Sequence, residues 1–236
     1  MIGTVDSLWR YPVKSMRGEE LAEVFIGFGG VQGDRRFAFH SSAAPLDFPF
    51  FTARQQTQML RYRPRVDPDN GSIEVETPSG KTLAIDDPAL IDELRSGADP
   101  KHKVTLVRFN RSQADGHAVS LMSVQTVQQL ADEAGLPPEK RRYRESIYLD
   151  LPNTNGFGED EFVGRSLRIG KDVVVAVVER DRRCMMTNLD PDSAAASPAM
   201  LKTIAQKHGG NAGVYGEVLR EGIVRKGDSV ELLRHE

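Results

Sequence analysis

The alternation of hydrophobic and polar positions in the first hundred residues is typical of short β-strands separated by turns. Strands are predicted over residues 2–13, 21–30 and 35–41, and the last of these segments follows the strand period of two. Residues 72–85 contain two alternating runs joined by Pro-Ser-Gly, which predicts a β-hairpin. A short helix is predicted near residues 87–97. The first half of the chain therefore predicts a barrel or sandwich of short strands.

The second half predicts two longer helices between further strands. Residues 123–135 place apolar side chains on one helical face, with Ser123 as the N-cap and Gly135 at the end. Residues 197–210 repeat this pattern, with Ser197 as the predicted N-cap. The remaining predicted strands cover residues 146–151, 166–179 and 227–233.

Together these elements predict a mainly β protein of the α+β class with a few helices. The polar, turn-rich segment Arg111–Asp115 is a natural boundary between modules. We therefore expect two modules packed together, residues 1–112 and residues 113–236.

The composition is that of an ordinary globular protein, with 39% hydrophobic residues and 34 acidic residues against 31 Lys and Arg in 236. A net charge of -3 argues against a general binder of polyanions, so no nucleic-acid partner is expected. The first residues lack the basic and apolar regions of a secretory signal, and no stretch approaches the roughly 18 apolar residues of a membrane-spanning helix. We expect a cytoplasmic protein with no membrane partner.

Cys184 is the only cysteine, so an internal disulfide, an iron–sulfur cluster and a structural zinc site within the chain are excluded. It follows the apolar run Val173–Val178, which predicts a buried strand whose loop begins at about Glu179. The neighbouring Arg182 and Arg183 favour a thiolate, the form that attacks electrophiles or binds a soft metal. A free cysteine is also among the most buried residue types, so inert packing is the alternative.

A second group of candidate residues lies in two motifs, YPVKSM at residues 11–16 and GDRRF at residues 33–37. Pro12 predicts the end of a strand, which places Lys14 and Ser15 in a turn where an ammonium and a hydroxyl can bind a phosphate. Arg35 can add a bidentate contact to the same anion. The alternative for Arg35 is an ordinary salt bridge with Asp34.

The basic run over residues 140–146 precedes a predicted strand. One short basic run in a net acidic chain is typical of a solvated face. It can equally complete a pocket for one anionic ligand.

These motifs occur in an order that resembles the MOSC superfamily, named for the C-terminal domain of molybdenum-cofactor sulfurase. The resemblance is carried by YPVKSM, GDRRF, FTARQ, DRRCMMTNLDPDS and GVYGEVLREGIVRKGDSVEL, and it covers nearly the whole chain. It implies a MOSC-type β-barrel packed against an N-terminal β-barrel-like domain. The layout is most similar to the mitochondrial amidoxime-reducing components and their bacterial counterparts.

The resemblance also assigns roles to individual residues. It implies that Cys184 is the molybdenum ligand and a catalytic residue, and that Asp190 is a second catalytic residue acting as a proton relay, although Leu-Asp-Pro-Asp is equally a common turn. The cofactor-binding residues that it implies are Lys14, Ser15, Arg35, Arg144, Ser146, Arg183, Thr187 and Asn188. The chain departs from the family's Arg-Pro-Asn at Glu145, which would repel an anion if it faced the pocket.

The function implied is a molybdenum-cofactor (Mo-molybdopterin) oxidoreductase that reduces N-hydroxylated small molecules by oxygen-atom transfer. With no further cysteines, the chain needs a separate electron donor: a ferredoxin-like protein, a flavoprotein or a cytochrome b5-like protein. One alternative is a molybdenum-cofactor carrier, or a sulfur-transfer protein with a persulfide on Cys184. Another is a non-enzymatic binding module in which the cysteine is structural.

Overall fold

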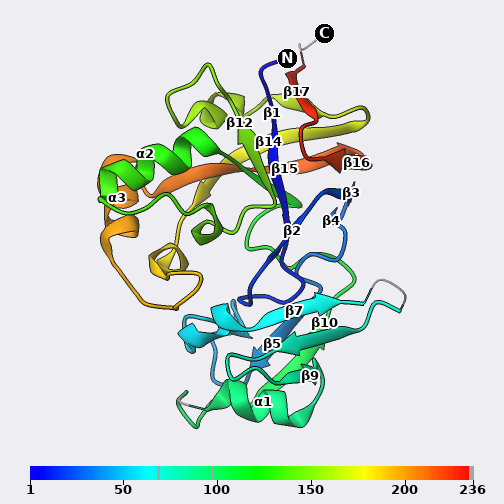
Figure 1. Cartoon of the computed structure of the whole chain (residues 1–236), viewed down its shortest axis with the longest axis vertical. Coiled ribbons are helices and arrows are strands. Elements are labelled where there is room, and N and C mark those ends of the chain that lie inside the picture. Colours follow the sequence, from blue (N-terminus) through cyan, green and yellow to red (C-terminus); the bar gives the residue numbers. More distant parts are fainter. Residues whose placement is uncertain (68–69, 97, 234–236) are drawn as a thin grey trace.

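The larger part of the fold is a closed seven-stranded β-barrel (Figure 1). The computed structural model describes residues 1–67, 70–96 and 98–233. In barrel order the strands are β1 (Gly3–Arg10), β12 (Ile147–Asp150), β11 (Val119–Ser123), β15 (Asn211–Arg220), β14 (Val173–Arg182), β13 (Ser166–Ile169) and β17 (Ser229–Leu232). The barrel closes because β1 pairs with both β12 and β17, and the short strand β2 (Glu19–Leu21) adds to β1 on the outside.

The barrel core is filled by aliphatic side chains from alternating positions of these strands. Val173, Val175 and Val177 of β14 point inward and are buried, as the apolar run predicts. The strand does not end near Glu179, however; it continues to Arg182, because pairing with β15 extends to Arg182 opposite Asn211 across several register shifts. Cys184 therefore lies directly beyond the strand rather than in the middle of a long loop.

Two helices cover one side of the barrel (Figure 1): α2 (Val124–Ala134) and α3 (Ala199–Lys207). The predicted ends of α2 are confirmed, since Ser123 Oγ accepts a hydrogen bond from Thr126 N at 3.0 Å and Gly135 has a φ of 65°. The predicted N-cap of α3 is wrong. Ser197 makes no cap bond; Asn188 Oδ1 instead accepts from Leu201 N at 2.9 Å.

The N-terminal module has its own core below the barrel in Figure 1. One sheet contains β5 (Phe37–Ser41), β6 (Phe50–Phe51) and β10 (Val104–Arg108), and the other contains β7 (Arg63–Val66), β8 (Ile73–Glu76) and β9 (Thr82–Ala84). Strands β8 and β9 confirm the predicted hairpin, and α1 (Pro88–Arg95) confirms the short helix, whose predicted last residue, Gly97, lies outside the described residues.

Smaller elements connect the two modules. A third small sheet contains β3 (Glu23–Gly27), β4 (Gly30–Val31) and β16 (Gly222–Arg225), so it joins the early chain to the C-terminal part. Within the residues that the structure describes there are also four short 3₁₀ segments: η1 (Thr57–Arg61), η2 (Lys140–Arg142), η3 (Gly158–Phe162) and η4 (Met185–Asn188). None of the helices in the described ranges combines the length and apolar character that a bilayer crossing requires.

The fold class is thus mainly β with three α-helices in the described part of the chain, in agreement with the prediction. Strand β1 comes from the predicted N-terminal module but is part of the barrel, so the two modules share backbone pairing. The boundary at residues 112 and 113 stays a prediction. The junction between the modules holds a cavity that is lined by both.

Candidate functional site

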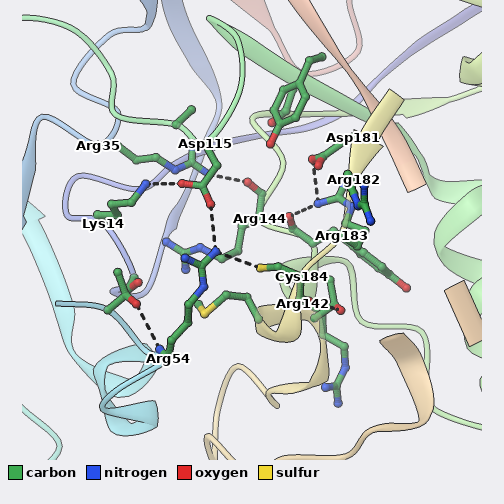
Figure 2. Close-up of a pocket in the computed structure, with 18 of the residues that line it drawn as sticks. Lys14, Arg35, Arg54, Asp115, Arg142, Arg144, Asp181, Arg182, Arg183 and Cys184 are labelled. Carbon is green, nitrogen blue, oxygen red and sulfur yellow. Dashed lines mark hydrogen bonds and ion pairs between the residues drawn. The ribbon is translucent and has the colours of Figure 1, made fainter. Parts of the chain in front are cut away.

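The cavity at the junction has a volume of about 250 Å³ and brings together most of the predicted site residues (Figure 2). Those that line it are Lys14, Ser15, Arg35, Arg144, Arg183, Cys184 and Thr187. They come from the early loops, from the segment before β12 and from the end of β14 and the η4 turn that follows it, so folding unites residues up to 173 positions apart (Lys14 and Thr187). Seven basic side chains and two carboxylates line the cavity, which makes it strongly cationic.

One side of the cavity, which we call the cationic wall, consists of Lys14, Ser15, Arg35 and Arg144. Buried contacts hold these side chains in place. Arg35 Nη2 donates to the carbonyl oxygen of Arg144 at 2.7 Å, and Arg144 Nη1 donates to that of Met16 at 2.8 Å. Lys14 Nζ donates to the carbonyl oxygen of Gln113 at 2.7 Å and pairs with Asp115.

The ring of Tyr11 lies close to both guanidinium groups of this wall. It lies 4.8 Å from the Arg35 guanidinium and 4.3 Å from that of Arg144. Asp34, which is 1% exposed, accepts from Arg35 Nη1 at 2.6 Å and from Tyr11 N at 2.8 Å. The salt bridge expected between Arg35 and Asp34 therefore exists, but it is buried and fixes the wall from behind.

The backbone of the cationic wall is strained at three of its residues. Ser15, Arg35 and Arg144 have φ values of 68°, 44° and 59°, in the left-handed region that side-chain-bearing residues seldom adopt. Each such residue costs roughly 1–3 kcal/mol and persists only where its surroundings hold it. Strain of this kind clusters at binding sites, and here it coincides with residues that the sequence predicts to bind an anion.

The electrostatics of the wall also favour an anionic ligand. Burial lowers the pKa of Lys14 and lowers the pKa of Arg144 to about 10, because each charge is partly removed from water. In the described part of the chain, Arg144 Nη2 is buried and has no hydrogen-bond partner. An unpartnered cationic donor is costly unless a ligand completes it.

Opposite this wall lies the cysteine loop, residues 184–197. Cys184 is half-buried, and its carbonyl oxygen accepts from both N and Oγ1 of Thr187, at 3.2 and 3.0 Å. Leu189 packs into the core of the N-terminal module and anchors the loop there. Arg54 crosses from that module and places Nη2 3.6 Å from Cys184 Sγ (Figure 2). The thiol therefore faces the Arg54 guanidinium in the cavity, whereas a cysteine that only fills space in the core would be surrounded by apolar side chains.

Arg183 is buried beside Cys184 and is held by several partners. It donates to the carbonyl oxygens of Ala212 at 2.6 Å and Tyr143 at 2.8 Å. It also pairs with Asp181 at 3.0 Å and with Glu145. Glu145 is fully buried against Arg183 and lies outside the cavity lining, so it does not repel an anion in the way the sequence left open.

Three predicted site residues lie outside the cavity lining. Asp190 Oδ1 accepts from Asp192 N at 3.2 Å, the arrangement of an Asx turn, and from Ser193 N at 2.9 Å, and its Oδ2 pairs with Arg142. Asn188 caps α3, and Ser146 is buried where its N–H donates to Ser120 Oγ at 3.1 Å. The side chains of Asp190 and Asn188 thus bind backbone N–H groups, and the backbone N–H of Ser146 binds a buried hydroxyl.

Sequence reasoning missed several residues that the structure brings to the cavity. Arg54, Phe48 and Asp115 reach it from loops of the N-terminal module and the predicted boundary, and Asp181 and Tyr215 reach it from β14 and β15. Arg54 and Tyr215 stand in the motifs FTARQ and GVYGEVLREGIVRKGDSVEL but were given no role, and Asp181 was visible as an acid among arginines just before Cys184. Among the described residues no three His, Cys, Asp or Glu side chains gather into a metal site of their own.

Comparison with solved structures identifies proteins of similar fold. The YuaD protein from Bacillus subtilis matches with a TM-score of 0.53 and 14% identity, over 100% of this chain and 98% of that chain. YiiM from Escherichia coli matches with a TM-score of 0.42 and 14% identity, over 96% of this chain and 71% of that chain. YiiM from Geobacillus stearothermophilus matches with a TM-score of 0.39 and 22% identity, over 50% of this chain and 54% of that chain. At these identities the YuaD match shows a shared fold alone.

Family models give a more specific result. No curated protein sequence matches the chain significantly. The model of the MOSC N-terminal beta barrel domain matches residues 2–134, and the model of the MOSC domain matches residues 109–231. Each match covers more than half of the chain, and together they span both modules. The chain therefore belongs to the MOSC family.

Proposed function

We propose that this protein is a molybdenum-cofactor-dependent oxidoreductase that reduces N-hydroxylated small molecules. MOSC domains are associated in general with binding of the molybdenum cofactor. The observation that supports the proposal best is the cavity itself, where the single thiol, Cys184, faces buried cations across the junction of the two modules. The thiol suits the metal end of such a cofactor, and the cationic wall suits its anionic phosphate end.

The residues present fit such a cofactor. Cys184 Sγ would supply the protein's sulfur ligand to molybdenum, and Lys14, Ser15, Arg35 and Arg144 would bind the phosphate and pterin. The unpartnered Arg144 Nη2 is the clearest sign that a hydrogen-bond acceptor belongs on this wall. When bound, the cofactor supplies two-electron oxygen-atom-transfer chemistry.

The chain's own residues prepare the site for substrate. Thr187 fixes the backbone at Cys184 through two hydrogen bonds to its carbonyl oxygen, and Arg54 holds a positive charge close to Sγ. The Arg54 guanidinium stacks on the ring of Phe48 at 4.3 Å. These two side chains form an amphipathic lip, where an N-hydroxylated substrate would enter and be oriented.

Electrons must come from a separate protein in this proposal. A ferredoxin-like protein, a flavoprotein or a cytochrome b5-like protein would serve. The role of the chain is then to hold the cofactor, position the substrate and manage protons.

The proposal is tested by loading and turnover. The protein is expressed in a host that makes the cofactor, molybdenum per chain is measured, and the reduced protein is mixed anaerobically with an N-hydroxylated amidine. We expect bound molybdenum and release of the amidine. Bound molybdenum without amidine would favour the carrier or sulfur-transfer function, and protein without molybdenum would refute the proposal.

A further inference from the structure

Reduction of an N-hydroxyl group needs protons at a defined place. The N–O bond breaks, the oxygen leaves as water, and the reaction R–NH–OH + 2e⁻ + 2H⁺ → R–NH₂ + H₂O balances only with two protons. Asp190 is poorly suited to supply one. Hydrogen bonds from the backbone N–H and hydroxyl of Ser193, together with Arg142, lower its pKa, and its carboxylate lies outside the cavity lining.

We propose that Asp181 is the proton donor of this site, and that Asp181, Arg183 and Glu145 together form a buried cluster that holds the proton. This inference rests on the proposed function and adds a catalytic residue to it. The cluster is defined by one guanidinium between two carboxyl groups.

The charge count of the cluster is the first argument. The side chains of Asp181 and Arg183 are each 6% exposed and that of Glu145 is 0% exposed. One positive charge thus faces two carboxyl groups in a region nearly without water. Two negative charges this close together are unfavourable, so Asp181 and Glu145 do not both ionise and one of them retains a proton at neutral pH.

The position of Asp181 is the second argument. Of the two carboxyl groups, only that of Asp181 belongs to a residue that lines the cavity in the described structure, whereas Glu145 is sealed against Arg183. Asp181 comes from the end of β14, three residues before Cys184. A substrate next to the thiol therefore shares one cavity with this acid, and Glu145 is a positioning residue that acts through Arg183.

The other charged groups around Asp181 leave it able to act as an acid. Burial raises its pKa to about 8, against a hydrogen bond from Tyr215 of β15 that lowers it. Asp115 from the loop before β11 and Glu179 on β14 raise the pKa further, and Arg35 of the cationic wall lowers it. A value near neutral pH suits a general acid, since the group is both protonated and able to release its proton.

The proton transfer is written as follows. The Asp181 O–H bond breaks as its proton joins the departing hydroxyl oxygen, and the N–O bond breaks to release water. The two electrons from the separate donor protein stay with the nitrogen as the N–O bond breaks, and the second proton, from solvent water through the open side of the cavity, joins that nitrogen to give R–NH₂. Asp181 then takes a proton from solvent and is ready for another turnover.

Three variants of the cofactor-loaded protein test this role. Asp181→Asn should keep its molybdenum but lose about 10²- to 10⁴-fold in kcat, together with the fall in rate that is expected of wild type above about pH 8. Glu145→Gln should keep the rate at low pH, but the fall should come at lower pH, because Arg183 then stabilises ionised Asp181 alone. Glu159→Gln removes another buried carboxyl group, bonded to Thr126 and away from the cavity, and should change neither rate nor pH profile.

Infrared spectroscopy of the protein without substrate gives a readout independent of turnover. The difference between wild type and Asp181→Asn should contain the carbonyl band of a protonated carboxylic acid at about pH 6 and lose it by about pH 10. Absence of that band, or an Asp181→Asn variant with the rate and pH profile of wild type, would overturn the assignment. A loaded wild type that reduces no N-hydroxylated compound would instead refute the proposed function, whereas the band reports on the cluster alone.

Discussion

The cationic wall and the cysteine loop face each other across the cavity, but different kinds of interaction hold them in place. The wall is fixed by a buried ion pair between Arg35 and Asp34 and by guanidinium donors on buried carbonyl oxygens. The loop is fixed by an Asx turn at Asp190, a helix cap at Asn188 and ion pairs of Asp192 at the surface. The polar contacts of the wall are therefore buried, whereas those of the loop are more exposed and Leu189 anchors the loop in the core of the N-terminal module.

This difference indicates how the site would accept a ligand. Left-handed backbone at three wall residues is maintained by the surrounding structure, so the wall is organised before any anion arrives. The loop can adjust around Cys184 at small cost, which suits a residue that must adapt to a metal's geometry. The following predictions test this contrast, from the largest effect on stability to the smallest.

Removing Asp34 should damage the wall severely. Asp34→Ala leaves the Arg35 guanidinium buried without its partner and frees the N–H of Tyr11, so we expect the free energy of unfolding to fall by about 3–5 kcal/mol. Chemical denaturation measures the change. Asp86→Ala at an exposed position is the control and should stay within about 0.5 kcal/mol of wild type. Equal effects of the two substitutions would contradict a wall fixed from behind.

Removing the cap on α3 should cost less. Asn188→Ala deletes the acceptor of Leu201 N–H, so the free energy of unfolding should fall by about 1 kcal/mol, while molybdenum and pterin content stay unchanged. Ser197→Ala, at the cap position that the sequence predicts, should have no measurable effect on stability. Loss of pterin from Asn188→Ala would mean that this side chain binds the cofactor after all.

The surface ion pairs of the loop should contribute least, and in a pH-dependent way. Hydrogen bonds from Arg141 and Arg17 lower the pKa of Asp192 to about 2. The folded-state pKa is below the unfolded one, so the contribution is present above the unfolded value of about 3.9 and is lost as pH falls through about 2. Because Asp192 is 55% exposed, solvent reduces the effect of Asp192→Asn at neutral pH to about 0.5–1 kcal/mol.

Urea denaturation of wild type and Asp192→Asn across this pH range checks the prediction. The difference between the two should vanish near pH 2 and shrink in high salt. A difference that grows on acidification would have the wrong sign for this ion pair.

Local patterns in the sequence predicted part of the elements. The hairpin of β8 and β9 and the caps of α2 depend on neighbouring residues and were predicted correctly. The run of β14 was predicted as a strand, but it is buried only at alternate positions and extends to Arg182. The strands β7, β10, β11 and β15 were not among the predicted ones. The motif resemblance also led to Cys184 and the cationic wall. These features are encoded within a few positions of where they act.

What the sequence could not supply depends on contacts between distant residues. Nothing near β1 indicates that it pairs with both β12 and β17. The motif FTARQ marks the segment that contains Arg54, but it does not indicate that this side chain reaches a thiol 130 positions away. Asp181 and Asp190 flank the same cysteine with the same side chain. Burial raises the pKa of Asp181, whereas hydrogen bonds from Ser193 lower the pKa of Asp190.

The central claim is that the cysteine loop and the cationic wall hold two ends of one cofactor, and measuring molybdenum and pterin in the same samples tests it most directly. Wild type, Cys184→Ser and Arg144→Met are expressed side by side in a host that makes the cofactor. We predict that Cys184→Ser keeps most of its pterin but loses molybdenum by about tenfold or more, and that Arg144→Met loses both together. A Cys184→Ser variant with as much molybdenum as wild type would contradict the account.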